Sequence, residues 1–295
     1  MNGVVLTLNA GSSSVKFALY QAGGSVPELK AKGQVEGIGA APHFIAKDAS
    51  GFLLAESYWE HVGGGAEHTL AFRQIWHWLK GVIEGERLLA VGHRVAHGGE
   101  QYAQPVLIDE RVIADLKRLI PLVPLHQPHN LAAMYAVSKS HPKLPQVACF
   151  DTAFHRHRPA VSERFGLPFE LYEKGVRRYG FHGISYEYII TRLGEIAPHL
   201  AQGRVVVAHL GSGCSMCAIH GGKSIETTMS FSALDGLPMG TRCGTLDPGV
   251  LLHLMRREHM SVEDLEDLLY KRSGLLGISG VSNDMRALQE SDRGY

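Results

Sequence analysis

The stretch VVLTLNAGSSSVKFALY (residues 4–20) decides the fold. An apolar run at 4–8 enters a loop of small residues at 9–14, and a second alternating run at 15–20 leaves it. Alternation on both sides of a small-residue turn predicts two antiparallel strands. The glycine and serines can offer amides and hydroxyl groups to phosphate oxygens, so the loop is either an anion cradle or an ordinary surface turn.

The cradle interpretation depends on where the second strand begins. If it begins early, Ser12, Ser14 and Lys16 point to one side, because strand side chains alternate between faces. Two hydroxyls and an ammonium group on one side would then meet an anion.

Further elements follow along the first half. The sequence predicts short strands within 30–60, a helix at 68–79, a strand at 88–97 and a helix capped by Asp109 that runs to 119 before Pro121. A helix at 129–140 and a strand at 146–150 complete this half.

The pattern then restarts. A strand at 204–210 leads into a glycine turn, short strands surround 220–223, and Ser261 caps a helix that ends near Gly274. Ser282 is the predicted cap of a last helix. Two rounds of strand, turn, strand and helix predict a duplicated α/β fold, with domains at 1–150 and 151–295 and a cleft between them.

Eight segments carry a resemblance to a known family. NAGSSSVKF (9–17) is similar to the first phosphate loop of the acetate and propionate kinases, which are short-chain acyl kinases of the actin, sugar-kinase and Hsp70 superfamily. The other segments are GHRVAHGG (92–99), PLHQPHN (124–130), FDTAFH (150–155), RRYGFHG (177–183), HLGSG (209–213), MGTRCG (239–244) and SNDMR (282–286).

The resemblance implies two ribonuclease-H-like (actin-like ATPase) domains. Residues 1–150 would carry the first phosphate loop and an acyl-site arginine, and residues 151–295 the second loop and the nucleotide side. The family's chain normally continues past the position of Tyr295 with an adenine loop, a metal-binding glutamate and a returning helix, so the second domain is expected to be incomplete at its C-terminus.

The same resemblance implies the nucleotide contacts. ATP would be the co-substrate, with Mg²⁺ or Mn²⁺ bound through Asn9. The family usually has asparagine where Ser212 stands, so that contact would be lost or bridged by water. The implied nucleotide-binding residues are Asn9, Ser12, Ser14, Lys16, His209, Leu210, Gly211, Ser212, Gly213, Asp284, Met285 and Arg286.

Arginine, histidine and aspartate residues supply the implied catalytic groups. Strand alternation places Arg94 and Ala96 on one face. An isolated arginine is more often a surface ion-pair partner, but a guanidinium can also grip carboxylate or phosphate through two parallel hydrogen bonds. By resemblance, Arg94 would bind the acyl carboxylate, Arg242 the moving phosphoryl group and His182 its equatorial oxygens. Asp151 would act near the metal or orient Arg94.

The acyl pocket by resemblance is lined by Ala96, Leu125, Phe181 and Ala233. Acetate kinases commonly have valine at the first position and proline at the last, and propionate kinases can have alanine at the first. Smaller side chains leave room for about one or two more methylenes, each worth roughly 0.8 kcal/mol. Acetate and propionate are therefore both expected as substrates.

Composition favours a soluble enzyme. Lysines plus arginines and aspartates plus glutamates number 29 each, which gives no charge excess for nucleic acid or membrane. No apolar run reaches the length of a membrane span, and the N-terminus resembles a strand rather than a signal peptide. Four cysteines suit a reduced cytoplasm better than a disulfide framework.

The Cys214 and Cys217 pair has the spacing of a zinc motif, but it lacks a second pair, and a strand would point the two thiols to opposite faces. The pairs His155/His157 and His126/His129 are likewise interpreted as buried or loop residues. No zinc site is predicted.

These observations predict reversible transfer of the γ-phosphoryl group of ATP to acetate, giving ADP and acetyl phosphate, by a cytoplasmic homodimer. The alternative is a catalytically impaired, truncated form that retains only nucleotide or anion binding and dimerisation.

Overall fold

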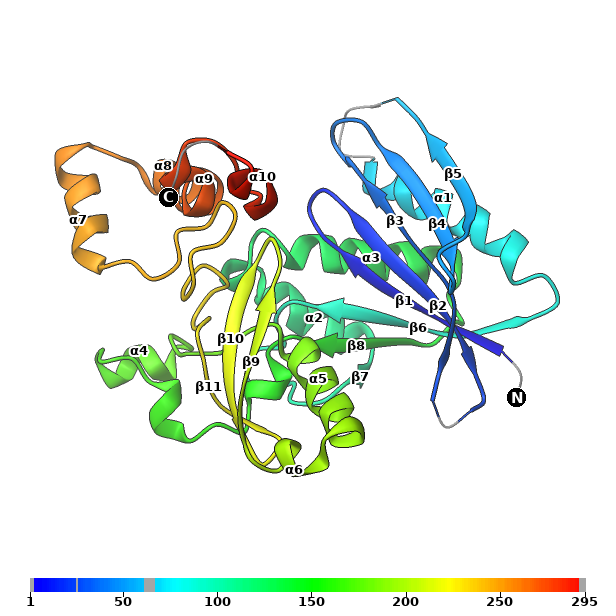
Figure 1. The fold of residues 1–295 in the computed structure, drawn as a ribbon, viewed down its shortest axis with the longest axis horizontal. Helices are drawn as coiled ribbons and strands as arrows, with labels where there is room; N and C mark the ends of the chain where they lie inside the picture. Colours follow the sequence, from blue (N-terminus) through cyan, green and yellow to red (C-terminus); the bar gives the residue numbers. More distant parts are fainter. Residues whose placement is uncertain (1–2, 25, 61–66, 292–295) are drawn as a thin grey trace. The chain divides into compact units, whose positions relative to one another are not determined.

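The computed structural model describes residues 3–24, 26–60 and 67–291 (Figure 1). The chain divides into two compact units, Met1–Phe150 and Asp151–Tyr295. No helix of the described residues is both long and apolar enough to cross a membrane.

The first unit is built on an eight-stranded sheet in the order β5-β4-β3-β2-β1-β6-β8-β7. The first five strands pair antiparallel in sequence, whereas β6 runs parallel to β1 and β8 parallel to β6. Three antiparallel strands followed by two parallel ones are the core of a ribonuclease-H-like domain. The strands are β1 (Gly3–Ala10), β2 (Val15–Ala22), β3 (Glu28–Glu36), β4 (His43–Asp48), β5 (Leu53–Tyr58), β6 (Arg87–Val95), β7 (Val106–Leu107) and β8 (Gln146–Phe150).

One face of this sheet is covered by helices. The register pairs Leu8 with Phe17 and Leu6 with Val91, so the apolar side chains of β1, β2 and β6 share a face. They form one core with residues of α1 and α3, including Ile75. Burial of this face, at about 25 cal/mol per Å² of apolar surface, holds the unit together. The helices are α1 (Glu67–Val82), α2 (Glu110–Arg118) and α3 (Gln127–Ser140).

The second unit repeats the first three strands. β9 (Arg204–Leu210), β10 (Cys214–His220) and β11 (Lys223–Thr227) form an antiparallel sheet in the order β11-β10-β9, as β3-β2-β1 do in the first unit. The β10–β11 turn is Gly221-Gly222, both with positive φ (55° and 74°), which a type I′ hairpin turn requires.

Helices make up much of the rest of the second unit. A small core joins the sheet to α5, where Tyr186 packs with Cys217 and Ile219. The helices are α4 (Phe169–Glu173), α5 (Gly183–Ile196), α6 (Pro198–Ala201), α7 (Pro248–Arg257), α8 (Val262–Lys271), α9 (Gly274–Ser279) and α10 (Met285–Gln289).

The predicted N-caps of two helices, α2 and α8, are confirmed, whereas the predicted N-cap of the last helix is not. The Asp109 side chain accepts from the Val112 amide at the start of α2, and Ser261 forms a capping box with Asp264 in α8. The prediction that Ser282 caps the last helix is wrong. Asp284 is the cap of α10, because its carboxylate accepts from the Arg286 amide.

Candidate active site

In the first unit, three predicted side chains lie on the face of the sheet opposite the core that includes α1 and α3. Asn9 pairs directly with Lys16 across β1 and β2, and both are exposed. Leu8 pairs with His93 on the buried face, so the next residue of each strand, Asn9 and Arg94, takes the opposite face. The Arg94 guanidinium donates to Asn9 Oδ1 at 3.4 Å. The structure therefore brings together an amide, an ammonium and a guanidinium, a set suited to an anion.

The loop between β1 and β2 differs from the prediction. β2 begins at Val15, so Ser12 and Ser14 lie in the turn, and the expected row of Ser12, Ser14 and Lys16 on one strand face is wrong. Ser12 is exposed and Ser14 half-buried. The Gly11 amide donates to the Ser14 carbonyl at 2.8 Å, and His68 of α1 donates to the Gly11 carbonyl, also at 2.8 Å.

Asn130 joins the ends of β1 and β6, a role that sequence reasoning did not assign. Its Nδ2 donates to the Ala10 carbonyl and its Oδ1 accepts from the Ala96 amide, each at 3.0 Å. Asn130 is buried. β6 ends at Val95, so strand alternation stops before Ala96, and this bond fixes the Ala96 backbone instead. Asn130 is the last residue of the segment PLHQPHN (124–130), and its place in that segment was the sequence feature that could have indicated this role.

In the second unit, four predicted residues meet at the turn after β9. The His182 and His209 rings stack with centroids 4.1 Å apart. A β-carbon built on Gly213 would lie 2.6 Å from Arg242 Nη2 and 3.6 Å from His182 Cε1. Two imidazoles and a guanidinium therefore line a glycine turn whose amides can also meet phosphate.

His182 is held in an unusual backbone conformation. It is the N-cap of α5 and has φ 60° and ψ 18°, in the left-handed region that few residues other than glycine adopt. The following Gly183 amide donates to the Asp151 carbonyl at 2.8 Å, and a β-carbon on Gly183 would collide with that oxygen. The buried Asp151 thus fixes the start of α5 through its backbone.

Arg242 is held by its own loop and by the start of α9. Its Nη1 donates to the Ala233 carbonyl at 2.6 Å. The Leu275 amide donates to the Met239 carbonyl at 2.8 Å, which anchors the loop. Gly274 has φ 61°, and a β-carbon there would collide with that Met239 oxygen.

The predicted adenosine segment lies beside this loop. A β-carbon on Gly240 would be 3.1 Å from the Asn283 carbonyl oxygen. Asp284 forms an ion pair with Arg286 at 2.6 Å, and the hydrogen bond from Arg286 lowers the pKa of Asp284 to about 2. Met285 is exposed.

The four predicted acyl-pocket residues are divided between the units. Ala96 is buried and Leu125 is 40% exposed in the first unit. Phe181 is buried and Ala233 half-buried in the second. The Phe181 carbonyl accepts from His155 Nε2 at 2.9 Å, and burial lowers the pKa of His155 to about 4. His155 is therefore a neutral, structural histidine.

The described residues were compared with the ligand requirements of a metal ion. Within 3–24, 26–60 and 67–291, no three His, Cys, Asp or Glu side chains are grouped so that they could hold one. Cys214 donates to the Pro238 carbonyl, whereas Cys217 is buried 3.4 Å from Ser224 Oγ. The amide oxygen of Asn9 is a ligand type that Mg²⁺ accepts, but it already receives the Arg94 bond.

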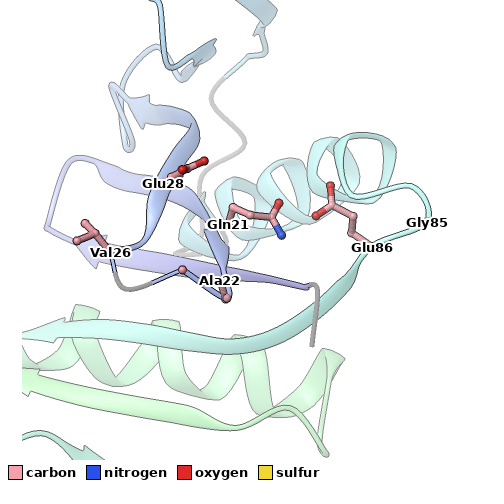
Figure 2. Close-up of a pocket in the computed structure, with 8 residues that line it drawn as sticks. Gln21, Ala22, Val26, Glu28, Gly85 and Glu86 are labelled. Carbon is pink, nitrogen blue, oxygen red and sulfur yellow. The ribbon is translucent and has the colours of Figure 1, made fainter.

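A pocket of about 490 Å³ lies elsewhere in the first unit (Figure 2). Its lining includes Ala22, which pairs with Gly3 at the opposite end of β1 from Asn9. Glu28 and Glu86 also line it, and Glu86 forms an ion pair with Lys30. Two carboxylates disfavour a phosphate, so this pocket is not a candidate for the nucleotide.

Comparisons with known proteins show which family the chain resembles. Residues 4–294 match the model described as the acetokinase family. The chain is 51% identical to an acetate kinase of Methylocella silvestris, with 99% of this chain and 74% of that protein covered. It is 52% identical to an acetate kinase of Rhodopseudomonas palustris, covering 99% and 73%.

Comparison with solved structures leads to the same group of enzymes as the sequence comparison. A propionate kinase from Francisella tularensis superposes with a TM-score of 0.89 at 36% identity, covering 98% of this chain and 73% of that one. The acetate kinase of Porphyromonas gingivalis gives 0.84 at 38% identity, covering 98% and 72%. Fold and family together define a phosphotransferase of the kinase class. The chain belongs to the acetokinase family.

Proposed function

We propose that this protein transfers the γ-phosphoryl group of ATP reversibly to a short carboxylic acid, with acetate as the principal substrate and propionate also accepted. The observation that carries the proposal is the meeting of Arg242, His182 and His209 at the glycine turn 211–213. The curated relatives named above are acetate kinases, and one of the solved structures is a propionate kinase.

The chemistry requires charge neutralisation rather than a base. A carboxylic acid with a pKa near 4 is ionised at neutral pH and can attack phosphorus directly. Charge then develops on the phosphoryl oxygens, and prearranged donors stabilise it. Arg242 and His182 would donate hydrogen bonds to those phosphoryl oxygens. Arg94, whose guanidinium donates to Asn9 Oδ1, would hold the carboxylate.

The nucleotide would lie on the second unit, with its phosphates near His209, Leu210, Gly211, Ser212 and Gly213 and its adenosine near Asp284, Met285 and Arg286. Asn9, Ser12, Ser14 and Lys16 would contact phosphate from the first unit. Mg²⁺ or Mn²⁺ would be held by the nucleotide phosphates and Asn9, and it would neutralise phosphate charge. Asp151, which is buried, would act near the metal or orient Arg94.

Assembly and location are further parts of the proposal. We expect a homodimer, because the family resemblance implies one, and a location in the cytoplasm, because the four cysteines suit a reduced compartment. Sedimentation at micromolar concentration tests the first point, and a monomer would contradict it.

The activity is tested by trapping the acyl phosphate with hydroxylamine. The protein with Mg²⁺, ATP and acetate should give acetohydroxamate at a rate that depends on both substrates. The matched control is Arg242→Lys, which keeps the charge but not the planar fork. Absence of hydroxamate from a folded protein that still binds ATP would contradict the proposal.

A further inference from the structure

Two buried hydroxyl groups lie behind the His182 ring. Ser215 Oγ, from β10, is 2.8 Å from His182 Nδ1 and 2.5 Å from the hydroxyl oxygen of Tyr186 in α5. The side chains of Ser215 and Tyr186 are fully buried, at 0% exposure. A serine and a tyrosine from different elements thus connect the α5 core to the candidate phosphate site.

Counting protons fixes the direction of the first bond. Of the described residues, only Ser215 forms a hydrogen bond with the Tyr186 hydroxyl. A fully buried phenol proton needs an acceptor, so Tyr186 donates and Ser215 Oγ accepts. Burial also raises the pKa of Tyr186 to about 12, so the phenol keeps its proton at neutral pH.

The second bond follows from the first. The Ser215 hydroxyl has a single proton, and its partners within the described part of the chain are Tyr186 and His182. Since Tyr186 is a donor, the serine proton goes to His182 Nδ1. That nitrogen is then an acceptor, and a neutral imidazole carries its proton on the other nitrogen.

We propose that Ser215 and Tyr186 are positioning residues that hold His182 in the Nε2–H tautomer. This inference rests on the proposed function, in which His182 donates to phosphoryl oxygens. In the Nε2–H form the ring presents a donor through Nε2, whereas the other tautomer would present a lone pair to an anion. Stacking on His209 fixes the plane of the His182 ring, and the left-handed backbone at the N-cap fixes the backbone that carries it. The chain of two hydroxyl groups, from Tyr186 through Ser215 to His182 Nδ1, decides which ring nitrogen carries the proton.

A purely structural role for these hydroxyl groups makes a different prediction. In that case they fill a buried space, and loss of one lowers stability without changing the imidazole. Tyr179 provides a matched control for this effect. It is also buried in the second unit, and its hydroxyl donates to the Gly175 carbonyl at 2.9 Å.

The test uses protein labelled with ¹⁵N in its histidines and long-range ¹H–¹⁵N correlation spectra, in which the two tautomers differ. The His182 signals are assigned by their absence in His182→Gln. We expect the Nε2–H tautomer in the unaltered protein and in Tyr179→Phe. Tyr186→Phe should populate the Nδ1–H tautomer. An Nδ1–H ring in the unaltered protein overturns the proposal without any variant.

Kinetics separate this inference from the proposed function. Tyr186→Phe should change the tautomer ratio by about fivefold, the effect of one net hydrogen bond, and should lower kcat in proportion to the lost fraction of the Nε2–H form, with KM for ATP and acetate unchanged. Tyr179→Phe should leave kcat unchanged. A tautomer change in a protein that makes no acyl phosphate refutes the proposed function alone. Normal activity with no tautomer change in folded Tyr186→Phe refutes the hydroxyl chain alone.

Discussion

Gly213 lies so close to Arg242 that a β-carbon on the glycine would stand 2.6 Å from the Nη2 atom of the guanidinium. A contact this short cannot be accommodated unless the arginine moves. Arg242 also donates to the Ala233 carbonyl, so its side chain is positioned from two sides. The glycine leaves space for the arginine, and we therefore expect it to matter for the proposed reaction in addition to any contact with the nucleotide.

Gly213→Ala should consequently act through Arg242. We expect it to lower kcat, and we expect Arg242→Ala to lower kcat by about 10²-fold or more. In the double variant the losses should not add, because the alanine has no arginine left to displace. Steady-state kinetics of the four proteins test this. Fully additive losses would show that Gly213 acts independently of Arg242.

Arg94→Ala and Arg242→Ala should fail in different ways. Arg94 is proposed to hold the carboxylate in both the ground and transition states, so its loss should raise KM for acetate and also lower kcat. Arg242 is proposed to act mainly on the transition state, so its loss should lower kcat with little change in KM. Equal, small effects of both changes on the two constants would contradict these assignments.

Ala96→Val tests the acyl site. Ala96 is buried, and valine adds two carbon atoms where the pocket wall is proposed. Each methylene is worth about 0.8 kcal/mol, so kcat/KM for propionate should fall severalfold more than kcat/KM for acetate. The ratio of the two substrates in one protein cancels any general loss of folded enzyme. An equal response to both acids would mean that Ala96 does not line the pocket.

A surface cluster makes stability depend on pH. His43 Nδ1 lies 3.2 Å from Glu36 and its Nε2 2.8 Å from Glu56. Hydrogen bonds to Glu36 and Glu56 raise the pKa of His43 above 6.5. The hydrogen bond from His43 lowers the pKa of Glu56 below 4.5.

The directions of these two pKa shifts define the pH range in which the cluster stabilises the fold. The histidine contributes stability below its unfolded pKa of 6.5 and loses it as pH rises through the higher folded value. The glutamate contributes above 4.5 and loses it as pH falls through the lower folded value. His43→Gln should therefore lower Tm most between about pH 4.5 and 6.5. His77→Gln is the control, since His77 is exposed on α1 and forms no ion pair with the described residues. A Tm difference that does not vary with pH would contradict the prediction.

Local patterns predicted much of the fold. The hairpin of β1 and β2, the Asp109 cap and the strand Gln146–Phe150 follow from alternation and capping, which depend on neighbouring residues. Helix α5 was not predicted, because GISYEYIITRLGEI is rich in β-branched and aromatic residues that favour strands, and packing of Tyr186 overrides that preference.

Part of the candidate site was also predictable, because some of its residues belong to local sequence motifs. His182, His209 and Arg242 belong to recognisable motifs, and the structure does bring them together. Asn130 and Ser215 could not be assigned, because their partners are distant in sequence. Asn130 contacts the carbonyl of Ala10, 120 residues away, and Ser215 contacts His182, 33 residues away. Alternation indicates that such a side chain is buried, but it does not indicate which group lies opposite.

The most direct test of the account follows the oxygen atom that attacks phosphorus. Acetate labelled with ¹⁸O in its carboxylate is incubated with the protein, Mg²⁺ and ATP, and the products are observed by ³¹P NMR. Direct transfer predicts an acetyl phosphate signal with the shift caused by one ¹⁸O, together with unlabelled ADP, and no product without acetate. Formation of inorganic phosphate alone, or of no phosphorylated acid, would contradict the central claim that this site phosphorylates a carboxylate.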